Sequence, residues 1–166
     1  MAAVSNCSPL RYFIAIGRAE LLPGVLGNIV IPAAVLRELT HASAPESVRS
    51  WMRRLPGWLT VQSVAADTQT LVLARVLDEA LDPGESEAIQ LALANGADFI
   101  LIDERRGRRE AQSRGLKTIG ALGVLLEAYR LGLLAEPDRA LDELRLQGFR
   151  VSNRLEEEFR RAILLR

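Results

Sequence analysis

The segment GESEAIQLALANGADFILIDERRGRR, residues 84–109, is the most informative part of the sequence for the fold. Pro83 and Gly84 interrupt the chain before a predicted helix over residues 85–95, and Gly96 ends that helix. An apolar strand is predicted over residues 98–103, and a further helix over residues 104–114. A buried strand between two helices is typical of a parallel sheet with helices on its faces.

The same alternation extends from this segment toward both ends of the chain. Further strands are predicted at residues 2–5, 28–31, 59–64 and 117–120. Further helices are predicted at residues 9–17, 19–26, 33–41, 45–55, 68–81, 121–131, 137–147 and 152–164. The central strands are mostly apolar, as expected for strands that are covered on both faces, so the pattern predicts an α/β protein with a parallel sheet.

Composition excludes several classes of protein. The chain has 166 residues and equal numbers of acidic and basic side chains, 21 each, so any nucleic-acid binding must come from a local patch. A single cysteine, Cys7, excludes an intramolecular disulfide and a zinc–cysteine cluster, and is typical of a reducing compartment. We recognise no signal peptide and no apolar run of the ~18 to 20 residues that a membrane span needs. We therefore expect a cytoplasmic protein that does not bind membranes.

Acidic and amide side chains stand where predicted strands end and predicted helices begin. Asn6 ends the first strand, Glu38 lies in the helix after the second, Glu85 opens its helix, and Asp103 and Glu104 follow the buried strand. These positions meet along one edge of a parallel sheet. Oxygen ligands without histidine or cysteine suit Mg²⁺ or Mn²⁺. Two such ions about 4 Å apart commonly hydrolyse phosphodiesters.

Each of these side chains also has a purely structural interpretation. Glu38 could face solvent from its helix, and Glu85 could favour the helix dipole. Glu104 could cap the following helix. Asp103 is the strongest indication of a site, because an acid that directly ends a buried strand must be held by some partner.

A basic run follows the last of these acids. It consists of Arg105, Arg106, Arg108 and Arg109, which form either a solvated helix face or a rim that binds phosphates. No aromatic residue interrupts the run, so base stacking is not indicated within it. His41 is the only histidine and is predicted to end a helix, so a serine–histidine–acid triad is not expected.

Several segments together resemble the PIN domain, a small α/β nuclease family that includes many toxins of bacterial and archaeal toxin–antitoxin modules. They are VSNCSPL (4–10), IVIPAAVLREL (29–39), residues 84–109 and GLKTIGALGVLLEAYRLGLL (115–134). The chain is most similar to a branch that begins SN-x-SPL. The resemblance implies one domain over residues 1–166, a three-layer α/β/α sandwich with a parallel five-stranded sheet, and C-terminal helices, about residues 136–166, packed on it.

The resemblance also implies a function. It implies a metal-dependent ribonuclease that cleaves RNA, or less often DNA, and that is the toxin of a toxin–antitoxin pair, with an antitoxin protein as partner and a homodimeric assembly. The residues that match the family's Mg²⁺ or Mn²⁺ ligands are Asn6, Glu38, Glu85 and Asp103, with Glu104 as a supplement. Ser8 matches a small hydroxyl residue near the first ligand, and we expect Ser8 and the four arginines of residues 105–109 to bind the nucleic acid.

Asn6 is the important departure from the family pattern, in which aspartate is usual. The amide keeps one carbonyl oxygen and loses a negative charge, and Cys7 stands where threonine is usual. A cation site with one charge fewer should bind magnesium more weakly. The alternative function is therefore a catalytically weak PIN-like module that binds nucleic acid or a protein.

The substitution Asn6→Asp separates these two functions. If the site is an active nuclease that lacks one charge, the added carboxylate should raise metal affinity and nuclease activity together. Calorimetric titration with Mn²⁺ and an RNA cleavage assay measure the two effects. An unchanged metal affinity would contradict this explanation.

Overall fold

The computed structural model describes residues 2–165, apart from the side chain of Thr68. Its strands are β1 (Ala2–Ser5), β2 (Asn28–Pro32), β3 (Leu59–Gln62), β4 (Phe99–Leu101) and β5 (Thr118–Ile119). The helices are α1 (Cys7–Ala15), α2 (Leu21–Leu26), α3 (Ala33–Thr40), α4 (Glu46–Met52), α5 (Thr68–Asp78), α6 (Pro83–Asn95), α7 (Arg105–Ser113), α8 (Ala121–Arg130), α9 (Pro137–Leu146) and α10 (Asn153–Leu164).

The strands form one parallel sheet of five strands in the order β3-β2-β1-β4-β5. β1 is central, and its Val4 pairs with Val30 of β2 and with Ile100 of β4. The predicted parallel five-stranded sheet is thus confirmed. Because all strands run the same way, all their carboxyl ends lie at one edge, where α/β proteins usually bind ligands.

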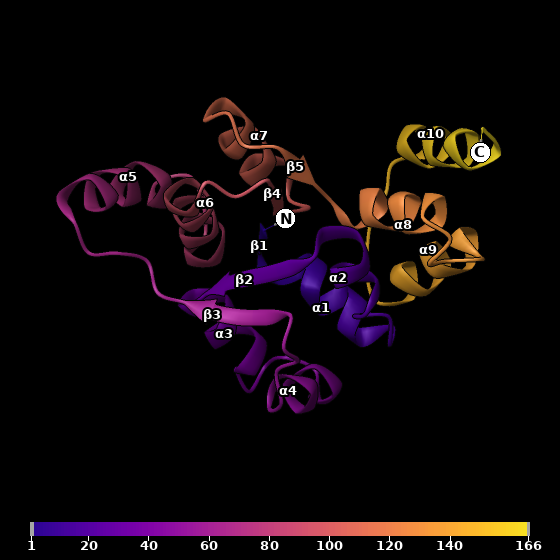
Figure 1. Ribbon diagram of the computed structural model, residues 1–166, viewed down its shortest axis with the longest axis horizontal. Coiled ribbons are helices and arrows are strands. Elements are labelled where there is room, and N and C mark those ends of the chain that lie inside the picture. The colour runs from indigo at the N-terminus through magenta and orange to yellow at the C-terminus, as the bar shows by residue number, and fades with distance from the viewer. Residues whose placement is uncertain (1, 166) are drawn as a thin grey trace.

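Alternate residues of the strands pack into two separate hydrophobic cores. Ala3 and Leu101 belong to the larger core, which includes side chains of α1, α2, α8 and α9. Val4 and Ile100 belong to the smaller core, which includes side chains of α5, α6 and α7. The sheet is therefore covered on both faces, which confirms the three-layer α/β/α arrangement (Figure 1).

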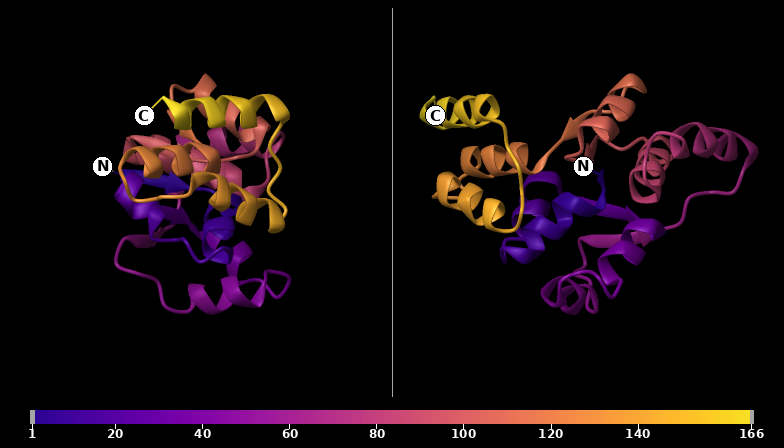
Figure 2. Two further views of the ribbon diagram at one scale, coloured as in Figure 1. Left: turned by 90° about the vertical axis from the view of Figure 1, so that its right-hand side faces the viewer. Right: turned by 180° about the vertical axis from the view of Figure 1, so that it is seen from behind.

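The last two helices contact the rest of the chain through buried side chains, such as Leu141 of α9, and through ion pairs. Arg18, in the turn that follows α1, forms an ion pair with Glu143 of α9 at 2.7 Å. Arg145 of α9 forms a second ion pair with Glu156 of α10. Phe159 of α10 is buried in the larger core. In Figures 1 and 2, α10 stands beyond α8, on the side away from α5 and α6.

Some boundaries differ from the prediction for simple reasons. α1 begins at Cys7, two residues before Pro9. A proline is tolerated there because the N–H groups of a first helical turn have no acceptor within the helix, so the missing N–H of proline costs no hydrogen bond. β3 ends at Gln62, because its partner in the ladder is Pro32, the last residue of β2. No helix within the described residues is both long and apolar enough to cross a membrane.

The larger core gives a direct test of the fold. Leu10 is fully buried in it, so Leu10→Ala should lower the free energy of unfolding by about 2–5 kcal/mol through lost contacts and a residual cavity. Leu146→Ala is the matched control, because Leu146 is 85% exposed and its loss should change stability by less than about 0.5 kcal/mol. Urea denaturation measures both, and equal losses would contradict this packing.

Candidate functional site

The carboxyl edge of the sheet brings four of the predicted site residues together. Asn6 follows β1 and is 2% exposed, and Glu104 follows β4 just before α7. Glu38 comes from α3, and Glu85 is the third residue of α6. The four side chains thus come from two strand ends and two helices, and we call them the acid cluster.

A chain of hydrogen bonds links β1, β4 and α1 within the acid cluster. Asn6 occupies the N-cap position of α1, yet its side chain makes no capping bond. Its Nδ2 instead donates to Glu104 Oε2 at 3.2 Å, and Ser8 Oγ donates to Glu104 Oε1 at 2.6 Å. An aspartate in place of Asn6 would face Glu104 as a like charge at the same place, which the amide avoids.

Gly84 lets several oxygen atoms approach the backbone of α6 more closely than any side chain at this position would allow. A Cβ atom at this glycine would lie 2.6 Å from Glu38 Oε1, 3.2 Å from Asn6 Oδ1 and 3.4 Å from Asp82 Oδ1. Asn6 Oδ1 is buried and has no hydrogen-bond partner in the structure. Since a buried acceptor without a donor costs about 1–3 kcal/mol, this atom is available for a ligand.

Glu85 is held by the start of its own helix. Its Oε2 accepts from the amide of Asp82 at 3.2 Å, and Asp82 Oδ1 accepts from the amide of Glu85 at 2.8 Å, which together form a capping box. Burial, followed by the charges of Asp82, Glu104 and Glu38, raises the pKa of Glu85 to about 7. Its carboxyl group therefore exchanges protons near neutrality when no cation is bound.

Glu38 and Cys7 form a second contact at the edge of the acid cluster. Glu38 as a whole residue is exposed, but its carboxylate lies against Gly84, and this local desolvation, with the charges of Asp82 and Glu104, raises its pKa. The Cys7 thiol hydrogen-bonds to Glu38, and burial together with that carboxylate raises the thiol pKa to about 12. Cys7 thus stays protonated and can donate to Glu38.

Asp103 is directed to a different place from Glu104, although the two are neighbours in sequence. Asp103 Oδ1 accepts from the amide of Ala121, at the start of α8, at 2.8 Å. Asp103 Oδ2 is buried and has no partner in the structure. Burial raises the pKa of Asp103 to about 6 despite the Ala121 bond, and Glu104 raises it further. Asp103 therefore stands beside the acid cluster and supports α8.

The donor atoms of the acid cluster fit a hard divalent cation. They are all oxygens, and Asn6 Oδ1, which has no partner, lies close to Gly84 together with Glu38 Oε1. Within residues 2–165, however, no three acidic, cysteine or histidine side chains are already arranged to hold a metal. Binding of a cation would therefore require side chains of the acid cluster to rotate.

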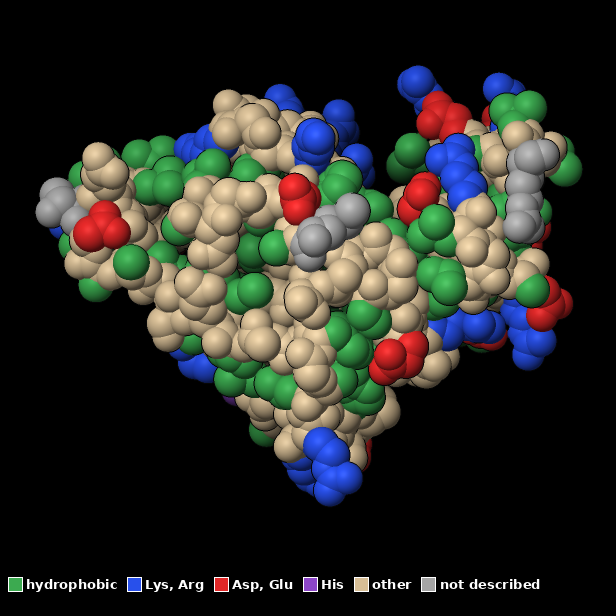
Figure 3. Space-filling view, viewed as in Figure 1, with side chains coloured by type: hydrophobic (Ala, Val, Ile, Leu, Met, Phe, Trp, Pro, Cys, Tyr) green, Lys and Arg blue, Asp and Glu red, His purple; other side chains and the backbone are tan. Residues whose placement is uncertain are grey.

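The predicted basic residues are divided between two sides of α7. Arg108 lies in a groove beside the acid cluster, while the guanidinium of Arg106 donates to the carbonyl oxygen of Ala80 at 3.0 Å. Arg105 and Arg109 are exposed. Figure 3 shows arginine side chains over α7, next to a notch that separates α7 from α10. The basic run is thus largely on the surface near the site.

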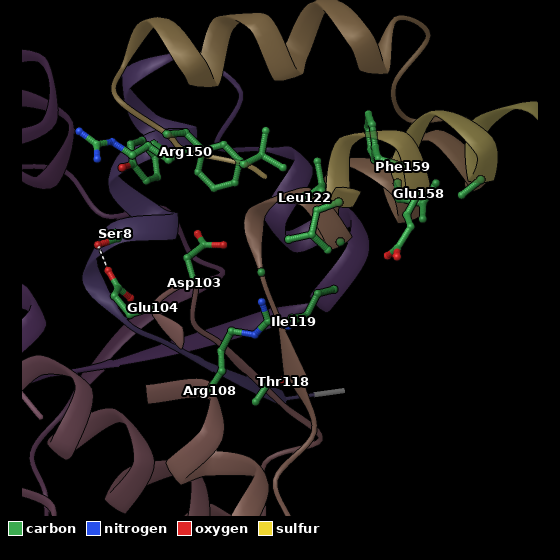
Figure 4. A pocket seen from close by; sticks show the side chains of 18 of the residues that line it. Ser8, Asp103, Glu104, Arg108, Thr118, Ile119, Leu122, Arg150, Glu158 and Phe159 are labelled. Carbon is green, nitrogen blue, oxygen red and sulfur yellow. Dashed lines mark hydrogen bonds between the residues drawn. The ribbon is translucent and has the colours of Figure 1, made fainter. Parts of the chain in front are cut away.

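The notch is the mouth of a groove of about 680 Å³. We call it the apolar groove, since much of its lining is apolar, including Ile119, Leu122, Phe149, Val151 and Leu155. Figure 4 shows that Ser8 and Glu104 lie on one side, Leu122 and Phe159 on the other, and Asp103 between them. The groove therefore opens directly beside the acid cluster.

Sequence reasoning missed two parts of the site. Gly84 was recognised as a break in the chain, but its neighbours Asn6 and Glu38 are distant in sequence, so their close approach to this glycine gave no sequence signal. Asp82 had a signal, because an aspartate three residues before a glutamate and next to a proline is typical of a helix start.

Comparison with known proteins identifies the family. A family model described as a PIN domain matches residues 2–163, which is nearly the whole chain. No curated protein is similar enough to this chain to count as a match.

The pKa of Glu85 predicts a pH-dependent stability without metal. A pKa raised from 4.5 to about 7 means that folding favours the protonated form, so stability should fall as pH rises through this interval. Glu85→Gln keeps an oxygen for the capping box and should be about 1–3 kcal/mol more stable than the native protein at pH 8, but equally stable near pH 4. Urea denaturation with a chelator measures this difference.

The control for this prediction is Glu87→Gln. Glu87 lies on the same helix, and its Oε2 accepts from the amide of Ala34 at 2.9 Å, a bond that glutamine can keep. This variant should leave the pH dependence of stability as it is in the native protein. A gain at pH 8 in the control but not in Glu85→Gln would contradict the assignment to Glu85.

Proposed function

This chain belongs to the PIN-domain family, and we propose that it is a metal-dependent endoribonuclease that hydrolyses RNA phosphodiester bonds. PIN domains are generally nucleases that use divalent metals. One observation carries the proposal: Glu38 Oε1 and Asn6 Oδ1 both lie close to Gly84, Asn6 also donates to Glu104, and burial with the charges of Asp82, Glu104 and Glu38 raises the pKa of Glu85. Like charges in such number are costly without a cation, so a cation is the natural complement.

The residues of the acid cluster would hold the metal ion, and Ser8 beside them would orient one of its ligands. Asn6 Oδ1 and the carboxylates of Glu38, Glu85 and Glu104 would hold Mg²⁺ or Mn²⁺. Ser8 would keep Glu104 oriented through its 2.6 Å hydrogen bond. When bound, such an ion supplies the positive charge that activates water and stabilises the charge that develops on the phosphate.

Asp103 and the arginines would act beside the ion. Asp103 would fix the start of α8 and border the groove, and its free Oδ2 could supplement the ligands. Arg108 would contact the phosphate nearest the acid cluster. Arg105, Arg106 and Arg109 would attract the RNA backbone along α7, mainly through charge.

A catalytically weak module that binds nucleic acid or a protein is the second candidate. Two observations favour it: Asn6 supplies an amide in place of a carboxylate, and no three acidic, cysteine or histidine side chains in the described part of the chain form a ready metal site. In this case the acid cluster would not support catalysis, and the groove would be the surface that binds the nucleic acid or protein.

The wider biological role is proposed from the family resemblance alone. We propose that the protein is the toxin of a toxin–antitoxin module, that it binds an antitoxin protein, forms a homodimer and acts in the cytoplasm. We also propose that residues 1–166 are one PIN-like domain, which is supported by the larger core that α8, α9 and α10 share with the sheet.

Two glutamine variants test the nuclease proposal. Glu38→Gln and Glu104→Gln should each lower Mn²⁺ affinity and the rate of RNA cleavage by at least about 10- to 100-fold, because each removes a negatively charged ligand. Calorimetry with Mn²⁺ and cleavage of a labelled RNA pool measure the two effects. Glu87→Gln is the control and should keep both.

The outcomes distinguish the two candidate functions. RNA cleavage that requires Mn²⁺ or Mg²⁺ and is lost in both variants supports the nuclease. Native protein that binds no Mn²⁺ and cleaves no RNA would overturn it and favour the binding module. Asp103→Asn should reduce Mn²⁺ affinity less than Glu104→Gln does, and the reverse order would show that Asp103 belongs to the ligand set.

A further inference from the structure

The apolar groove has the form of a ligand-binding site that the acid cluster does not use. Its volume of about 680 Å³ lies within the range of about 300–1,000 Å³ that is usual for small-ligand pockets. The wall combines strand β5, helix α8, the segment before α10 and α10 itself. Most of these side chains are apolar, so the interior suits a flat organic group better than a hydrated ion.

The groove is continuous with the acid cluster. Ser8 and Glu104 line it, and the same two residues are hydrogen-bonded to each other in the acid cluster (Figure 4). A molecule that occupies both places must therefore carry one part for the oxygens and another part for the apolar wall. An RNA strand has this division, with a phosphate next to a base.

Polar groups at the groove favour a base over a phosphate in its interior. Asp103, Glu104 and Glu158 are all present in the lining, and carboxylates repel a phosphate but accept hydrogen bonds from the N–H groups of bases. Oδ2 of Asp103 is buried and has no partner in the structure, so a base that reaches it would supply the missing donor. Arg108 and Arg150 also line the groove, and their guanidinium groups can bind the flanking phosphates.

Aromatic side chains complete the site. Tyr12 and Phe149 both line the groove, and their rings meet edge to face with centroids 5.5 Å apart. This contact holds Phe149 in place against α1. A base placed against such a pair gains contact with a surface that is already ordered.

We propose that the apolar groove is a subsite for one unpaired base of single-stranded RNA, next to the phosphodiester held at the acid cluster. This inference rests on the proposed nuclease function for the identity of the strand. The base lies against Phe149 and Leu155, Asp103 accepts a hydrogen bond from it, and Arg108 and Arg150 bind the phosphates on either side. Double-stranded RNA is excluded from the groove because its bases are stacked and paired.

Binding without cleavage gives the test. A fluorescent random-sequence RNA hexamer and a matching hexamer without bases are titrated into the whole protein in a chelator, and anisotropy reports affinity. The RNA with bases should bind about 5- to 100-fold more tightly, as expected for contact with one base. Methyl NMR signals of Ile119 and Val151 should shift with the RNA pool and not with the hexamer without bases.

Two variants locate the binding site. Phe149→Ala should abolish most of the preference for bases, although the loss of its contact with Tyr12 could also unfold the segment. Leu155→Gln avoids this difficulty, because Leu155 is the third residue of α10, where glutamine favours a helix capped by Ser152. It should reduce the preference at least about twofold. Leu131→Gln is the control, since Leu131 is also partly exposed, at 54%, and lies outside the groove.

The readouts separate this subsite from the nuclease itself. Equal affinity for the two hexamers, or unmoved methyl signals, overturns the subsite even if the native protein cleaves RNA with Mn²⁺. A preference for bases that Leu155→Gln reduces and Leu131→Gln keeps supports the subsite even if no cleavage occurs. Loss of the preference in Leu131→Gln as well would assign it to another surface and overturn the proposal.

Discussion

The hydrogen bond from the amide of Asn6 to Glu104 is the contact on which the site depends. It joins the ends of the neighbouring strands β1 and β4, and Ser8 fixes the second oxygen of the same carboxylate. A carboxylate at position 6 would have repelled Glu104. The amide thus lowers the local negative charge and leaves Oδ1 directed toward Gly84 without a hydrogen-bond partner.

The edge of the sheet stabilises its acids in different ways, and none of them neutralises the charge. Glu85 belongs to a capping box, Asp103 accepts from the first amide of α8, and Glu38 accepts from a thiol. These bonds are partial compensation, because burial still raises the pKa of all three carboxyl groups. The burial of these carboxyl groups therefore lowers the stability of the fold at this edge, as is common at functional sites.

Much of the fold could be predicted because its signals are local. Gly96 ends α6, the apolar run of residues 98–103 marks β4, and alternation of strands and helices favours a parallel sheet. The acid cluster was partly predictable, since strand ends and helix starts of a parallel sheet share one edge. The relative roles of Asp103 and Glu104 were not predictable, because successive side chains at a strand end point in different directions.

The sequence alone therefore determined the order of the elements, the parallel sheet, the PIN-domain family and the group of oxygen-bearing residues at its edge. Only the tertiary structure decided which of them meet: Glu104 lies beside Asn6, Asp103 accepts from the first amide of α8, and Glu38 and Asn6 both approach Gly84. It also formed the apolar groove from α1, β5, α8 and α10. The physical reason is that periodicity and capping are short-range, whereas a cluster or groove depends on contacts between segments far apart in the chain.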